Sequence, residues 1–189
     1  MKMKFLSLAL GLSVALFMSS CGGKQSITKK TGFQEIEIPC TEKGQSDAAF
    51  FRASNVGKSK DLATSKEKAL LLCKQRLASL IGSTLKSVTE RYASEMDAAG
   101  ATEFNQNFEN MTRDVVNQKL QDITVTCEKT GMTSDGMYET YMAIEVSKEA
   151  ILNGINNGIS RDKKLEVKYD QMKFKEKFDE EMNKLEKQN

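Results

Sequence analysis

The fold is decided by residues 51–81, FRASNVGKSKDLATSKEKALLLCKQRLASLI, which join a strand to the start of a long helix. Small and apolar side chains recur at about three- and four-residue spacing, as on a helix with one buried face. They are Leu62, Ala69, Cys73, Leu77, Leu80, Leu85, Val88 and Tyr92. The pattern predicts a helix that begins after an N-cap at Ser59 and runs to about Met96, ending near Gly100. Gly82 costs about 1 kcal/mol inside this helix but need not break it.

The first turns of this helix carry small residues at four-residue spacing. Ser65, Ala69 and Cys73 make a flat strip, which lets a helix lie close on a sheet. Just before the helix, Gly57 permits a positive φ where the strand turns toward it. Asp61 is favourably placed in the first turn, near the positive end of the helix dipole. We therefore expect close packing of this helix on a sheet.

Short elements flank the helix on both sides. Alternation of apolar and polar residues predicts strands at 33–40 (FQEIEIPC) and 48–56 (AAFFRASNV), with a turn at 43–47 between them. A second helix is expected from Thr102 onward. Its apolar positions share one face: Phe104, Phe108, Met111 and Val115.

The second half of the chain begins with a hairpin pattern. Two alternating segments, LQDITVTCEKT and GMYETYMAIEVS, meet at a turn that contains SDG (134–136). A short helix is expected at about 148–158. This order of elements predicts an α+β two-layer sandwich over 33–158, in which a small antiparallel sheet is covered on one face by the long helix.

Residues 159–189 are predicted to form a charged amphipathic C-terminal helix. From Arg161 on, nine basic and eight acidic residues surround a thin apolar seam. The seam consists of Val167, Phe174, Phe178, Met182 and Leu185. Two interpretations stay open: the helix packs on its own domain, or the seam binds a partner helix or a second copy of the chain.

The N-terminus has the pattern of a secretory signal peptide. Lys2 and Lys4 precede an uncharged apolar run at 5–18, which is too short for a membrane-spanning helix. The small residues that follow end on a cysteine, and MSSC resembles the lipobox of bacterial lipoproteins. That resemblance implies removal of residues 1–20 and attachment of diacylglycerol to Cys21. Residues 21–32, which are polar and basic, are expected to be a flexible tether.

The residues after the lipobox bear on localisation. Position 22 is Gly and not Asp, which by resemblance to known sorting rules implies the outer membrane. The segment GGKQSITKK lacks the acidic cluster of some surface-exported lipoproteins. We expect a periplasm-facing protein, with surface exposure as the alternative.

Composition narrows the classes of function. The chain of 189 residues has a net charge of +2, and loss of Lys2 and Lys4 leaves it near neutral, which argues against nucleic-acid binding. The absence of histidine removes the usual Ser-His-Asp and Cys-His catalytic sets. The sequence also lacks the C-x-x-C spacing that would indicate a zinc site. We expect neither an enzyme nor a protein with a metal or cofactor.

Three cysteines remain once Cys21 carries lipid. Cys40 follows Ile36 and Ile38 in alternation, and Cys127 follows its own alternating segment. A Cys40–Cys127 disulfide is one interpretation if these strands are neighbours, since the periplasm is oxidising. The other is that the cysteines, Cys73 included, are small buried hydrophobic residues.

Part of the opening stretch also resembles a known family. The matching positions are Ala53, Gly57, Ser59, Ser65, Ala69, Cys73, Leu77 and Ala78. They resemble the small-residue stretch of the LPP-twenty family of outer-membrane lipoproteins, and the likeness extends loosely over 50–150. It implies helices over a small antiparallel sheet, an outer-membrane location and no accepted enzyme activity. We expect a lipid-anchored envelope protein with a scaffold, assembly or interaction role. The alternative is a surface lipoprotein that binds a ligand or a host.

Overall fold

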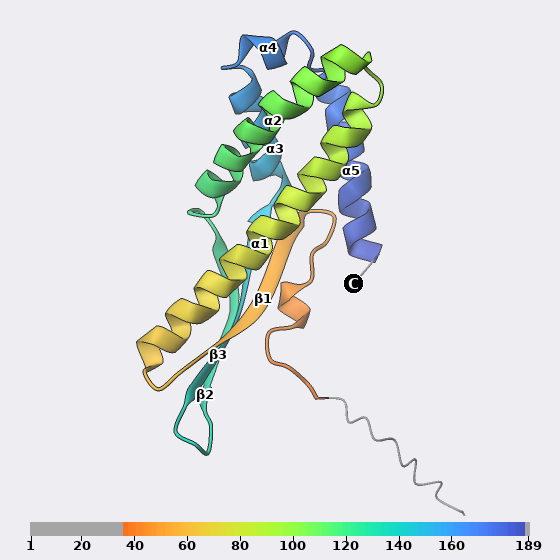
Figure 1. Cartoon of the computed structure of the whole chain (residues 1–189). Coiled ribbons are helices and arrows are strands. Elements are labelled where there is room, and N and C mark those ends of the chain that lie inside the picture. Colours follow the sequence, from red (N-terminus) through yellow and green to blue (C-terminus); the bar gives the residue numbers. More distant parts are fainter. Residues whose placement is uncertain (1–35, 188–189) are drawn as a thin grey trace, which may run out of the picture. The chain divides into compact units, whose positions relative to one another are not determined.

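The computed structural model describes residues 36–187, and its sheet lies along the first half of the long helix α1 (Leu62–Ala93), with the other helices toward the opposite end (Figure 1). The sheet has three antiparallel strands in the order β1-β3-β2. Their bounds are Phe50–Ser59 for β1, Thr124–Met132 for β2 and Tyr138–Ser147 for β3. Helices pack on one face, so the predicted α+β fold, with a long helix on a small antiparallel sheet, is confirmed.

The long helix α1 (Leu62–Ala93) packs on β1 and β3, and its strip of small residues lies against the sheet. Ser65 is buried, and its hydroxyl donates to the Gly57 carbonyl oxygen at 3.0 Å. A side chain on Gly57 would collide with the backbone of α1 at Ser65 and Ala69. Gly57 is therefore suited to close approach. The expected positive φ there is wrong, because the residue lies inside the extended strand β1.

The start of α1 also differs from the prediction. The N-cap is Asp61, whose carboxylate accepts a hydrogen bond from the Thr64 amide at 2.8 Å. Ser59 is instead the last residue of β1, so the strand continues three residues beyond the predicted end at 56. An ionised cap two residues later satisfies the free amides of the first turn at least as well as a serine.

The predicted strand at 33–40 is wrong for the residues that the structure describes. Residues 36–38 have no regular secondary structure, 39–40 lie in a turn and a short 3-10 helix, η1, follows at Glu42–Gly44. Cys40 has a φ of 63°, which lies in the left-handed region and outside the extended conformation of a regular strand. Pro39, just before it, lacks the amide that a sheet needs. Residues 33–35 lie outside the described part.

Four further helices complete the helical layer. They are α2 (Ala98–Lys119), α3 (Lys148–Ile159), α4 (Lys163–Glu166) and α5 (Gln171–Lys187). Both α2 and α3 begin within four residues of their predicted starts. No helix within 36–187 is long and apolar enough to cross a lipid bilayer.

The C-terminal region is not one unbroken helix as predicted. Its chain is interrupted between α4 and α5, and Asp162 and Asp170 accept hydrogen bonds from the first amides of the two helices. The Tyr92 hydroxyl of α1 binds the interruption itself: it donates to the Lys168 carbonyl oxygen at 3.0 Å and accepts from the Asp170 amide at 2.7 Å. These contacts stabilise the break.

The seam of α5 lies in the core of its own domain. Phe174, Phe178 and Met182 are fully buried, and the Phe178 ring meets Phe51 of β1 edge to face at 6.0 Å between centroids. Arg91 of α1 also forms ion pairs with Glu180 and Glu181 of α5. The described residues from Glu37 onward form one compact unit, which includes α4 and α5.

Candidate functional site

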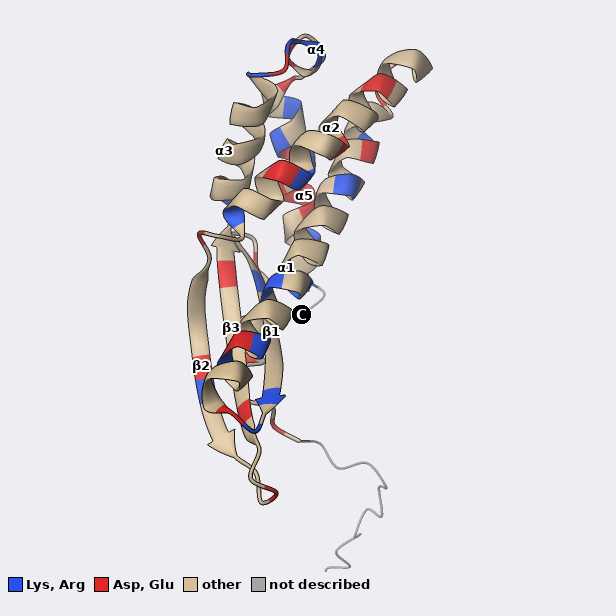
Figure 2. Ribbon diagram, turned by 60° about the vertical axis from the view of Figure 1, so that its left-hand side comes forward, with Lys and Arg blue, Asp and Glu red and all other residues tan. Residues whose placement is uncertain are grey.

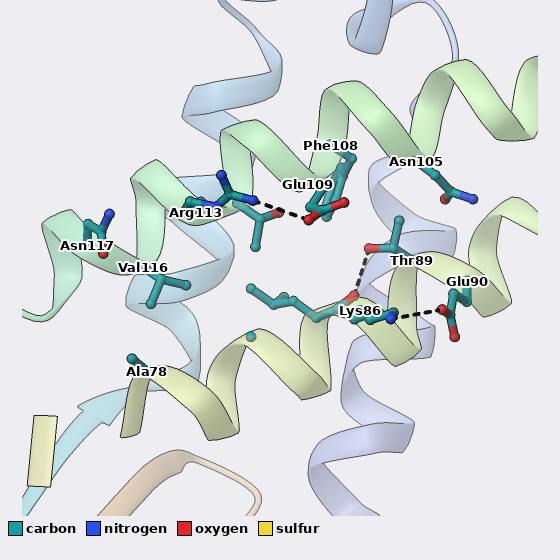
Figure 3. A pocket seen from close by; sticks show the side chains of 13 residues that line it. Ala78, Lys86, Thr89, Glu90, Asn105, Phe108, Glu109, Arg113, Val116 and Asn117 are labelled. Atoms are coloured by element: carbon teal, nitrogen blue, oxygen red, sulfur yellow. Dashed lines mark hydrogen bonds and ion pairs between the residues drawn. The ribbon is translucent and has the colours of Figure 1, made fainter. Parts of the chain in front are cut away.

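A pocket of about 490 Å³ lies between α1 and α2 (Figure 3). Its apolar lining includes Leu85 from α1 and Phe108 and Val116 from α2. All three are buried, and Phe108 stacks on Phe104 at 5.3 Å between ring centroids. The pocket therefore has walls that belong to the hydrophobic core, with an opening to solvent between the two helices.

On the face of α1 that turns toward α2, the sequence places two small residues and one leucine. Ala78, Gly82 and Leu85 follow one another at four- and three-residue spacing on that face. A Cβ atom built on Gly82 would meet no heavy atom within 4 Å among the described residues. Gly82 therefore leaves this space open. It also lowers helix stability by about 1 kcal/mol relative to Ala, and no close packing contact compensates for that loss.

Two buried polar atoms of α2, on residues that line this pocket, have no partner within the described part of the chain. Thr112 is 8% exposed, and its Oγ1 has no hydrogen-bond partner in the region that the structure covers. The same holds there for the buried Oδ1 of Asn105. Thr89, on the α1 side, differs because its hydroxyl donates to the Leu85 carbonyl oxygen at 2.7 Å. Buried polar atoms are rarely left unpaired, so these two point to a missing partner.

The rim of the pocket is charged but balanced. Lys86 and Glu90 on α1 are 4.0 Å apart, and Arg113 and Glu109 on α2 are 3.2 Å apart (Figure 3). Each pair lies within one helix at four-residue spacing and is mostly exposed to solvent. Figure 2 likewise shows basic and acidic positions interspersed along the helices. Such a rim attracts neither anions nor cations over a long range.

The chemistry of the pocket is suited to binding. Its lining includes apolar side chains of both helices, while the unpaired oxygen atoms of Thr112 and Asn105 are buried and do not face the open space. Within residues 36–187, no cluster of three His, Cys, Asp or Glu side chains could hold a metal ion. The carboxylates and cations of the pocket sit on its exposed rim.

The structure joins Cys40 and Cys127, the pairing that the sequence left open, in a disulfide with a Cα–Cα distance of 5.6 Å. The expectation that the two cysteines lie on neighbouring strands was wrong, because Cys40 lies in a turn. The turn crosses the face of the sheet that α1 leaves uncovered, and the Cys40 sulfur lies 3.6 Å from the Tyr141 carbonyl oxygen of the central strand.

Residues 40–47 are held on this face by contacts besides the disulfide. Gly44 lies so close to Ser54 of β1 that a side chain there would collide with it. Arg52 forms ion pairs with Asp47 and, at 2.7 Å, with Glu145 of β3. The two cysteines are therefore brought together by packing as well as by the bond.

The other predicted site residues lie apart from the pocket. Cys73 is a buried free thiol that donates to the Met142 carbonyl oxygen, and burial raises its pKa to about 11. Cys21 lies outside the described residues. Of the seam, Val167 is 85% exposed at the end of α4, and Leu185 packs partly buried against the core. Phe174, Phe178 and Met182 of the seam are buried within the chain itself, so they are not available to a partner in this structure.

Sequence reasoning did not find the pocket. Gly82 was weighed only as a cost to the helix, and Thr112 was not singled out. Thr112 lies four residues after Phe108 and four before Val116, on the buried face of α2. A polar residue in the apolar face of one helix, opposite a glycine in the next, was the available signal.

No family model, curated protein or solved structure matches this chain. The resemblance of residues 53–78 to the LPP-twenty family therefore stays a prediction.

Proposed function

We propose that this protein is a lipid-anchored component of the bacterial cell envelope with a non-catalytic scaffold, assembly or interaction role. It is anchored by Cys21 in the outer membrane and faces the periplasm. The observation that carries the proposal is the Cys40–Cys127 disulfide. Disulfides persist in oxidising compartments such as the periplasm and are rare in the bacterial cytosol, where thiols are kept reduced.

Two features connect this disulfide with the N-terminal signals. Cys40 stands 19 positions after Cys21, so the described body begins within a short length of chain from the lipidation site. The disulfide and the Arg52 ion pairs attach this entering segment to the sheet. A body fastened at its point of entry is suited to being held by a membrane anchor.

Fatty-acid labelling tests the anchor. Cells that express the full chain would be grown with an alkyne-bearing palmitate analogue, and the protein examined by gel and by mass spectrometry. We expect label on the wild type and on Cys73→Ser, in which the hydroxyl can still donate to Met142, and none on Cys21→Ser. An unlabelled wild-type chain that begins at Met1 would contradict the proposal.

Thiol trapping tests the compartment independently of the lipid. Cells would be quenched in acid and their proteins denatured and alkylated with a maleimide polymer before and after reduction. An exported, lipidated chain shows one reactive thiol, Cys73, before reduction and three after it. A wild-type chain in which Cys40 and Cys127 also react before reduction, giving four thiols, or three if Cys21 carries lipid, is not in an oxidising compartment. Protease treatment of intact cells then separates a periplasm-facing protein, which survives, from the surface-exposed alternative.

A further inference from the structure

We propose that this chain is a substrate of a thiol–disulfide isomerase, which converts an early Cys40–Cys73 bridge into the native Cys40–Cys127 bridge. The inference rests on the proposed function, because it requires export to an oxidising compartment. The connectivity of the cysteines carries it. Cys73 lies between the two bridged cysteines in the sequence, and it is a free, buried thiol in the structure.

The spacing of the cysteines favours the wrong bridge in the unfolded chain. Cys40 and Cys73 are 33 positions apart, whereas Cys40 and Cys127 are 87 positions apart. The entropy of loop closure makes the shorter loop form about four times as often. The Cys73–Cys127 loop, which spans 54 positions, competes as well. Random closure therefore gives the native pair in roughly one chain in seven.

The order of export increases this bias. A chain with an N-terminal signal crosses the membrane from its N-terminal side, so Cys40 and Cys73 meet the oxidant before Cys127 does. Lipid on Cys21 removes that thiol from the competition. The first bridge to form in the exported chain is therefore Cys40–Cys73.

The fold excludes this early bridge because the central strand separates its two sulfur atoms. Cys73 lies on α1, and its thiol donates to the Met142 carbonyl oxygen of β3 at 3.2 Å. The native bridge lies on the opposite face of the sheet, where Cys127 pairs with Ala143 of β3. A disulfide joins Cα atoms that are less than about 7 Å apart. A Cys40–Cys73 bridge would therefore pull α1 or the turn at Cys40 away from the sheet.

The rearrangement is a redox-neutral exchange. A disulfide-bearing oxidant forms the first bridge and takes up its two electrons and two protons. The isomerase thiolate then attacks the Cys40 sulfur, the bond to Cys73 breaks, and Cys73 leaves as a thiolate that takes up a proton. Finally, the Cys127 thiolate attacks the Cys40 sulfur of this mixed disulfide and releases the isomerase thiolate. One protein disulfide is present before and after the exchange.

Folding makes the exchange one-way. Cys73 is fully buried in the folded protein, and burial raises its pKa to about 11. Only a thiolate attacks a disulfide, so the folded chain protects its native bridge from Cys73. The exchange must accordingly take place before α1 packs on the sheet, while the chain is still open to an isomerase.

Oxidation of the isolated full chain tests the pairing without any need for export. All chains would carry Cys21→Ser, which lacks the thiol that lipid would occupy. After oxidation in denaturant, peptide mapping without reduction should find the native pair in roughly one chain in seven. On dilution, the chain's own exchange should take minutes to hours, and a catalytic amount of isomerase should make it about tenfold faster. Predominance of the native pair in denaturant, or no acceleration by isomerase, would overturn the proposal.

Expression of the wild-type chain tests the need for isomerase in cells. Strains with and without their periplasmic disulfide isomerase would be compared by peptide mapping of the same kind. Loss of the isomerase should reduce natively bridged wild type about threefold or more, toward the fraction that loop closure alone supplies. The Cys40–Cys73 bridge should take its place. Equal native bridging in the two strains would overturn the proposal.

Two variants show whether Cys73 is the reason for that need. Cys73→Ser leaves a single possible pairing, and its hydroxyl can still donate to Met142, so it should be bridged equally in both strains. Leu71→Ser changes an exposed position two residues away and keeps the competing thiol, so it should behave like the wild type. A fall for Cys73→Ser as large as that of the wild type would overturn the assignment to Cys73.

The redox state of the chain separates this inference from the proposed function. A chain that is fully reduced in both strains has not reached an oxidising compartment, which contradicts the proposed export and with it the isomerase. A chain that carries the native bridge in both strains supports export and contradicts only the inference.

Discussion

The two sides of α2 use glycine in opposite ways. On the side of α3, a Cβ on Gly154 would lie 2.7 Å from the Val115 Cγ1, and one on Gly158 would lie 2.6 Å from the Met111 sulfur. On the side of α1, a Cβ on Gly82 would meet nothing within 4 Å in the described region. Glycine brings α2 and α3 together but leaves a cavity between α2 and α1. The same residue type thus marks a tight interface and an open cavity.

The largest expected effect comes from filling the tight side. Gly154→Leu should lower the free energy of unfolding by about 1–3 kcal/mol, because Val115 is β-branched and cannot easily turn away. Gly82→Leu, its matched control on the open side, should cause no loss. Urea denaturation of both variants measures the difference. Equal destabilisation would mean that the two sides of α2 are packed alike.

A smaller effect is expected from the mildest change on the open side. Gly82→Ala should raise the free energy of unfolding by up to about 1 kcal/mol, since alanine favours the helix and its methyl group enters empty space. Thermal and urea unfolding would both detect the gain. A loss of stability would show that the space at Gly82 is smaller than the structure indicates.

The unpaired hydroxyl gives a still smaller effect on stability. In the absence of ligand, Thr112→Val should raise the free energy of unfolding by about 0.5 kcal/mol, because it removes a buried polar atom without a partner. Thr89→Val should instead lower stability, since the Thr89 hydroxyl is hydrogen-bonded to Leu85. Opposite signs for these two threonines would sharpen the contrast between filled and open parts of the pocket.

The least effect is expected from acid, which acts on the contact of α1 with α5. The hydrogen bond from the Arg91 guanidinium holds the pKa of Glu180 below its ordinary value near 4.5. Because the pKa of Glu180 is lower in the folded protein than in the unfolded chain, the ionised carboxylate stabilises the fold at a pH above the unfolded pKa. This stability is lost as the pH falls through the folded pKa and the carboxylate becomes protonated. The melting temperature should therefore fall below about pH 4.5.

Arg91→Gln serves as the comparison for the acid effect. Without the guanidinium, the pKa of Glu180 should return toward its ordinary value, and the fall in melting temperature between pH 7 and pH 3 should become smaller. Other paired carboxylates, such as Glu103 beside Lys168, keep part of the effect in both proteins. An equal fall in the two proteins would show that the Arg91 contact does not contribute to the loss of stability in acid.

The helices and the hairpin could be predicted because their signals are local. The stripe from Ala69 to Tyr92 has helical spacing, and the alternation on both sides of 134–136 belongs to paired strands. Alternation misled at 33–40, where Pro39 and the left-handed Cys40 prevent pairing in the described part. The break between α4 and α5 depends on Tyr92, which is far away in sequence, so charge and apolar spacing alone could not reveal it.

The pocket was harder to predict than the fold because it depends on what is missing. Spacing identified Leu85 and Phe108 as core residues, and both are buried. Whether the space beside them is filled depends on how far apart α1 and α2 lie, which no local pattern encodes. Gly82 and Gly154 look alike in sequence, and only the neighbours that tertiary packing supplies distinguish them.

The disulfide also determines how the body responds to tension. A pull on the chain before Cys40 passes through the sulfur atoms to Cys127 in β2. It bypasses residues 41–126, which contain β1, α1 and α2 and therefore the whole lining of the pocket. Tension on the chain before Cys40 would therefore load the hairpin of β2 and β3 before the two helices around the cavity.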